Sequence, residues 1–205
     1  MTEPASRGRC VGYRIVLPPG WAQIPLRSGT DEVIEAILDA VIGGLPDTGD
    51  LVDQRNWVAA RLREAAAAAR TNNGTHLYLP VAPAHGRTVA ASFVVAEIGF
   101  GSVEPLDPDL LVARLAADPN AAQVNVDGYA VSRAETVCPP DPGRGAPLPS
   151  HRVDYLMPFP DDPDRWLAVT CSVLQLGDGE LDPSATWIEL FDAIMSTFRW
   201  TKPPG

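Results

Sequence analysis

The residues best able to act as nucleophiles are three cysteines, and their surroundings favour an inert role. They are Cys10, Cys138 and Cys171, an odd number spread widely along the chain. Cys171 lies in a Thr-Cys-Ser segment but shares strand parity with Val169 and Val173, which places its thiol on an apolar face. A free cysteine in such a position behaves as a small buried apolar residue. We therefore expect Cys171 to be structural.

The three histidines are isolated, with no His-x-x-x-His or Cys-x-x-Cys spacing around them. A metal site would need several of His76, His85 and His151 to converge with other ligands in the fold. Cys138 precedes two prolines in a loop. It would gain a catalytic role only if His151 or His76 came within hydrogen-bond reach. From the sequence we expect no catalytic residue, no metal site and no cofactor.

Two further motifs fall short of known binding loops. The segment Gly99–Ser102 lacks both the third glycine of a dinucleotide-binding turn and a Gly-x-Ser-x-Gly elbow. Asp161, Asp162 and Asp164 resemble the start of a calcium loop, but Val173 stands where that loop has glutamate. We expect a solvated hairpin turn there, and likewise a solvated helix face for Arg61, Arg63 and Arg70 rather than an anion site.

Hydrophobic periodicity predicts an antiparallel sheet followed by a closing helix. Two alternating apolar segments, His151–Phe159 and Trp166–Leu176, predict neighbouring strands. A helix is expected to begin at Asp182-Pro183 and end near Trp200, with Asp192 facing away from the sheet. The other expected elements are strands over Gly12–Leu17, Thr75–Val81, Thr88–Phe100, Val124–Val126 and Tyr129–Val137, and helices over Asp31–Ile42, Asp53–Arg70 and Asp107–Leu115.

These elements predict an α+β fold, an antiparallel β-sheet with helices packed on its faces. The strand Thr88–Phe100 is apolar on both of its faces, so we expect it at the centre of the sheet with cover on both sides. A chain of 205 residues suits one core, so residues 1–205 are expected to form a single domain. A polar tail over residues 1–9 and a Pro/Gly-rich loop over residues 139–149 are expected to be mobile.

The composition excludes several classes of partner. The formal net charge is −10, which disfavours nucleic acid and anionic membrane surfaces because both need clustered Lys and Arg. No stretch approaches the roughly 20 apolar residues of a membrane span, so we expect no membrane insertion. With no secretory signal at the N-terminus and no disulfide framework, we expect a cytoplasmic location.

Three of the five tryptophans could bind a partner protein. Trp21, Trp57 and Trp200 lie near the ends of expected elements, where a partly exposed indole can anchor an interface. Each could instead seal an edge of the core. The run Ala65–Ala69 forms a small-residue helix face that suits close packing on the sheet or on a second copy, so a homo-oligomer is left open.

Motifs at the two ends of the chain resemble those of a known superfamily. Pro18-Pro19-Gly20-Trp21 follows an apolar strand, and Ser196-Thr197-Phe198-Arg199-Trp200 closes the last helix. Together they resemble the PsbP-like α/β/α sandwich superfamily, including its DcrB- and LpqN-type bacterial members and an actinobacterial branch. The resemblance implies a sandwich fold with no shared catalytic residues, and a non-enzymatic adaptor, chaperone or assembly factor.

We therefore expect a cytoplasmic protein-interaction module with a protein partner, and accessory service to a bacterial secretion system is one expected role. The alternative is a small-molecule-binding protein whose ligand occupies a concave sheet face lined by Tyr78, Phe93 and Tyr155. The two hypotheses differ on whether helix side chains fill that face. Fold analogy alone is a weak basis for either function.

Overall fold

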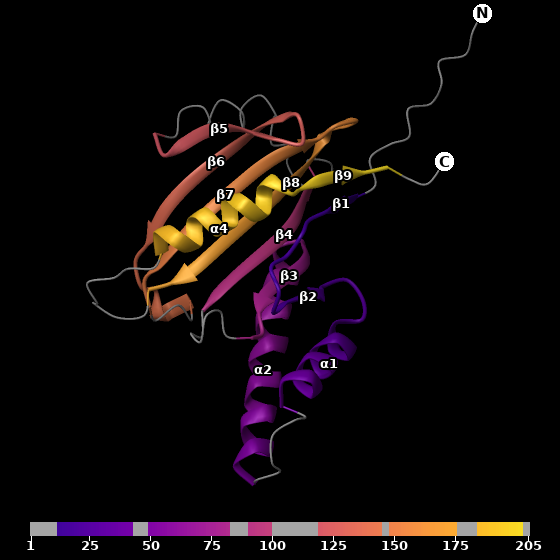
Figure 1. Cartoon of the computed structure of the whole chain (residues 1–205), viewed down its shortest axis with the longest axis vertical. Coiled ribbons are helices and arrows are strands. Elements are labelled where there is room, and N and C mark those ends of the chain that lie inside the picture. The colour runs from indigo at the N-terminus through magenta and orange to yellow at the C-terminus, as the bar shows by residue number, and fades with distance from the viewer. Residues whose placement is uncertain are drawn as a thin grey trace, which may run out of the picture.

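An antiparallel sheet of seven strands forms the centre of the protein (Figure 1). The computed structural model describes residues 12–42, 49–82, 90–99, 119–144, 148–175 and 184–202. The strand order is β2-β3-β4-β8-β7-β6-β5, and β1 and β9 pair as a separate two-stranded ribbon. The strands are β1 (Gly12–Arg14), β2 (Trp21–Pro25), β3 (Gly74–Pro80), β4 (Ala91–Gly99), β5 (Ala121–Val126), β6 (Tyr129–Cys138), β7 (Ser150–Phe159), β8 (Asp162–Leu174) and β9 (Arg199–Thr201), and the α-helices are α1 (Thr30–Ile42), α2 (Gly49–Thr71) and α4 (Ser184–Ser196).

Helices pack on both faces of this sheet, which confirms the predicted α/β/α sandwich. Helix α4 crosses one face over β7 and β8, while α1 and α2 pack against β2 and β3 (Figure 1). Successive side chains of β4 point alternately into the two layers. Phe93 and Val95 belong to the core beneath α4, and Val94 packs against the core beneath α1 and α2. The prediction of a central strand, apolar on both faces, is confirmed.

Helix α4 has the predicted apolar stripe but ends earlier than predicted. Ile188, Phe191, Ile194 and Met195 are buried at helical spacing and face the sheet. The helix ends at Ser196, and Arg199–Thr201 forms β9, which pairs antiparallel with β1. The prediction of a helix to Trp200 was wrong because the backbone there is satisfied by a strand from the opposite end of the chain.

Turns join the strands much as their residue types predict. Asp127 and Gly128 have φ values of 53° and 84°, so the β5–β6 connection is the tight two-residue turn expected from an Asp-Gly pair. Asn73, with φ of 57°, ends α2 where the Asn-Asn-Gly sequence predicts a stop. Strand β2 was not predicted. It pairs with β3 at the edge of the sheet.

Several predicted segments lie outside the described residues. They are the polar tail over residues 1–9 and the helix over residues 107–115. The loop over residues 139–149 is described in part, and residues Pro142–Arg144 form a short 3₁₀ helix there.

Candidate functional site

Helices α1 and α2 form a hairpin whose outer end projects beyond the sheet (Figure 1). Arg55 bridges to Glu35 and Asp39 at 2.7 Å each. Arg63 bridges to Asp31 at 2.8 Å and to Glu35 at 2.5 Å. The two arginines, first Arg63 and then Arg55, lower the pKa of the Glu35 carboxyl. Exposed pairs are individually weak, but these four bridges link α2 to α1 along the exposed side of their apolar contact.

Apolar contacts fix which side of α2 faces inward. Ala59 and Ala66 are buried in the core shared with α1 and β3, and Leu62 packs against that core. The seven-residue separation of the two buried alanines is two helical turns, so their stripe runs along one face. Ala65, Ala67 and other residues of the alanine run are exposed, so the run packs on the core through only part of its surface.

Trp57 lies on the outer face of α2, away from that buried stripe. Its side chain is 63% exposed, and the guanidinium carbon of Arg61 sits 5.7 Å from the ring centroid. Arg61 is one turn further along the same face, where a cation over the indole restricts its rotamers. Two more exposed apolar residues, Val41 and Val52, lie at the outer end of the hairpin. Of the three tryptophans predicted to bind a partner, Trp57 is therefore the one that presents a large apolar surface.

Trp21 and Trp200 are half-buried instead. Trp21 begins β2 and packs against the core beneath α4. Trp200 lies between Phe159 and Phe198, at ring-centroid distances of 4.8 Å and 5.0 Å. Its backbone N–H donates to Asp127 at 2.9 Å. These two indoles close the edge of the core, which was the alternative interpretation of the sequence.

Cys10 lies outside the described residues, and the structure does not bring Cys138 and Cys171 together with a histidine. Cys171 is fully buried, and burial raises the pKa of its thiol well above the ordinary value. Cys138 pairs with Ser150 across β6 and β7, and His151 pairs with Val137. Because neighbouring residues of a strand point to opposite faces, the side chains of Cys138 and His151 lie on opposite sides of the sheet. His85 is outside the described residues.

His76 belongs to a polar cluster between β1 and β3. The Tyr13 hydroxyl oxygen lies 2.7 Å from His76 Nδ1 and 3.1 Å from the Tyr78 oxygen, both within hydrogen-bond distance. Burial, and then the Arg27 charge, lower the pKa of His76 below 6.5. Burial also raises the pKa of Tyr13 and Tyr78. In the tautomer that carries its proton on Nε2, a neutral imidazole accepts from Tyr13, whose oxygen can accept from Tyr78.

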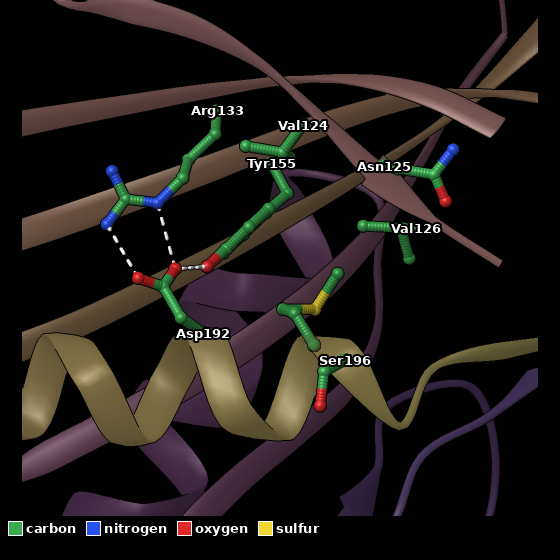
Figure 2. Close-up of a pocket in the computed structure, with 8 residues that line it drawn as sticks. Val124, Asn125, Val126, Arg133, Tyr155, Asp192 and Ser196 are labelled. Carbon is green, nitrogen blue, oxygen red and sulfur yellow. Dashed lines mark hydrogen bonds and ion pairs between the residues drawn. The ribbon is translucent and has the colours of Figure 1, made fainter. Parts of the chain in front are cut away.

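A small cavity of about 240 Å³ lies between α4 and strands β5 to β7 (Figure 2). At one end Arg133 binds Asp192 through two N–H groups, Nε at 2.8 Å and Nη2 at 3.1 Å. Tyr155 donates its O–H to the same carboxylate. Asp192 therefore does not face away from the sheet, and that prediction was wrong. The helical period indicates which residues share a face, but Arg133 reaches α4 from a strand far away in sequence.

The concave sheet face proposed for a small ligand is filled. Tyr78, Phe93 and Tyr155 are each no more than 2% exposed, because side chains of α4 and of the β1–β9 ribbon cover them. Only Tyr155 touches the cavity of Figure 2, where its hydroxyl is already bound by Asp192. The three residues do not form an open binding face.

No family model matches the chain, and no curated protein sequence matches it. In the parts of the chain that the structure describes, no group of three or more His, Cys, Asp or Glu is placed to hold a metal ion. No described helix is both long enough and apolar enough to cross a bilayer.

Proposed function

We propose that this chain is a non-enzymatic protein-interaction module and that the α1–α2 hairpin contacts the partner, with Trp57 as the anchor. One observation carries the proposal. Trp57 is 63% exposed on a helix, whereas the other four tryptophans of the chain are buried or half-buried. Burial of such an indole in a partner's pocket contributes about 2 kcal/mol or more, and tryptophan is among the residues most enriched in interface hot spots.

The hairpin is suited to this role because its geometry is set before binding. The Arg55 and Arg63 bridges tie α2 to α1, and Ala59 and Ala66 anchor α2 on the core. A partner would therefore meet an ordered helix face, which reduces the entropy lost on association. The stacked Arg61 restricts the indole and adds a rim charge beside it.

The finer role that we propose is a cytoplasmic adaptor, chaperone or assembly factor, with service to a bacterial secretion system as one such role. The PsbP-like motifs around Trp21 and Phe198 support it, as does the net charge of −10, which disfavours nucleic acid. Inert burial of Cys171 also favours a binding role over nucleophilic catalysis.

Affinity capture with matched variants tests the proposal. The baits are the full chain, Trp57→Ala and the control Val137→Ala, which removes another exposed apolar residue, 58% exposed, on β6. We expect the full chain and V137A to retain the same protein from native-host lysate and W57A to lose it, with equal melting temperatures. Retention of that protein by W57A, or its loss from V137A as well, would refute a hairpin anchor.

A further inference from the structure

Three arginines from separate parts of the chain line one cleft beside the end of α2. The cleft has a volume of about 490 Å³, and Arg27, Arg70 and Arg165 contribute to its wall together with Glu97. Arg27 and Arg165 both reach Glu97 Oε2, at 3.0 Å and 3.2 Å. This arrangement was not predicted: Arg70 was expected on a solvated helix face rather than at an anion site, because the three residues are distant in sequence and share no motif.

Two of these guanidinium groups are held by contacts other than the Glu97 carboxylate. Arg165 stacks over the Phe159 ring, with its guanidinium carbon 4.2 Å from the centroid. Arg70 donates Nε–H to the Leu26 carbonyl at 2.6 Å and Nη2–H to Thr30 Oγ1 at 3.0 Å. Those bonds use two of its five N–H groups. The positions of both arginines are therefore set before any ligand binds.

The cleft is locally positive in an acidic protein. Three guanidinium groups face one carboxylate, so the lining carries about two net positive charges at neutral pH, although the whole chain carries −10. His76 senses these charges too: burial is the main cause that lowers the pKa of its imidazole, Arg27 lowers it further and Glu97 opposes the change. Such a field concentrates small anions at the cleft.

The C-terminus of α2 lies beside the cleft, but it does not cancel the cleft's preference for anions. Carbonyl oxygens at the C-terminus of a helix carry partial negative charge and repel anions. In α2, Thr71 Oγ1 donates to the Ala67 carbonyl and Asn72 Nδ2 donates to the Ala68 carbonyl, both at 3.0 Å. The backbone N–H of Asn73 donates to the Arg70 carbonyl at 3.1 Å. The last carbonyls are thus occupied by donors.

We propose that this cleft binds a phosphate dianion, either free or as the monoester group of a small molecule. Guanidinium forks match the paired oxygens of a phosphate, and the two net positive charges match its charge. The volume is in the range of small-ligand sites. In the bound state the anion takes N–H donors of Arg70 and Arg165, and the exposed Arg27 closes over it.

Titration of the full chain with inorganic phosphate, followed by NMR at constant ionic strength, tests the site. We expect saturable shifts of the Asn73 and Gly74 amides with a dissociation constant on the order of 1 mM. The pKa of His76 rises on binding, because the anion offsets the Arg27 charge. A parallel titration with glucose 6-phosphate separates the two sources: tighter binding indicates a monoester, and equal binding indicates the free ion.

Variants make the test specific. Arg27→Gln removes an arginine that is 67% exposed and is paired with Glu97, and it should weaken phosphate binding about fivefold. Arg61→Gln is the matched control, since Arg61 is 62% exposed and paired with Glu64 away from the cleft. It should leave phosphate binding at the cleft unchanged. Absence of saturation at 20 mM phosphate, or equal weakening by R61Q and R27Q, would overturn the proposal.

Discussion

Tyr155 on β7 donates its hydroxyl to the carboxylate of Asp192 on α4, and the same carboxylate receives two N–H groups of Arg133 (Figure 2). The bond joins the sheet to the helix that covers it. Burial is the main cause that raises the pKa of Tyr155, and the hydrogen bond to Asp192 adds to it, so the phenol stays protonated and acts as the donor.

Asp192→Asn should therefore destabilise the protein by about 1–2 kcal/mol. The amide carries no negative charge, and its NH₂ group cannot accept a hydrogen bond, so the three donors lose part of their acceptor. The side chain of Asp192 is 44% exposed, so solvent screening limits the effect. Urea unfolding measures it. Glu189→Gln on the exposed side of the same helix is the control and should change stability by less than about 0.5 kcal/mol. Equal losses in both variants would contradict the role of the Asp192 contact.

Cys171 should be unreactive in the folded protein, because its thiol is fully buried and its pKa is raised. Cys138 is half-buried at the end of β6 and should react before Cys171. Labelling with a disulfide reagent followed by peptide mass mapping separates the two. Cys171→Ser should cost about 1–3 kcal/mol by placing a hydroxyl in the apolar core, whereas Cys138→Ser should cost much less. Rapid labelling of Cys171 in the native state would contradict this assignment.

Stability should fall as the pH drops below about 6.5, in part because of His76. Burial and Arg27 lower the pKa of this imidazole in the folded state relative to 6.5. The unfolded chain therefore binds the proton more readily than the folded one, and the stabilisation present above pH 6.5 is lost as the pH falls toward the folded-state value. Melting temperatures at pH 7.5 and 5.0 measure the effect. In His76→Gln the melting temperature should fall less between these two pH values, because carboxylate titration contributes equally to both proteins. An equal fall in the two proteins would contradict this role of His76.

Gly74→Ala should destabilise the junction between α2 and β3 by about 2 kcal/mol or more, because overpacking there cannot relax. A Cβ at this position would lie 2.6 Å from the Ala69 carbonyl oxygen and 2.8 Å from Leu26 Cδ1. The first of these is backbone inside a helix and cannot move aside. Gly143→Ala is the control, since its Cβ would meet its nearest neighbour, Asp141 Oδ1, only at 3.4 Å. Thermal melts of the two variants should differ clearly, and similar melts would show that the junction can adapt.

The layers of the fold were predictable because they depend on local periodicity. Alternation along β4 sends Phe93 to one core and Val94 to the other, and a period of two residues is visible in any segment of that length. The Asp127-Gly128 turn was equally predictable, since its positive φ angles favour those residue types. The apolar stripe of α4 was predictable for the same reason, because its apolar residues recur at helical spacing.

Exposure at the candidate site was only partly predictable. Trp21, Trp57 and Trp200 look alike in sequence, each near the end of an element. Their burial differs because different residues pack against each indole. Phe159 and Phe198 enclose Trp200, whereas no described contact except Arg61 restrains Trp57. A neighbour that comes from elsewhere in the chain leaves no local signal.

The sequence alone determined the α+β class, the central strand and the inert position of Cys171, because each follows from side-chain alternation within one segment. The tertiary structure decided the pairing of β9 with β1, the Asp192 contact with Arg133 and Tyr155, and the meeting of Arg27, Arg70 and Arg165 in one cleft. These are contacts between residues far apart along the chain. Their geometry follows from how whole elements pack, and no local pattern specifies it.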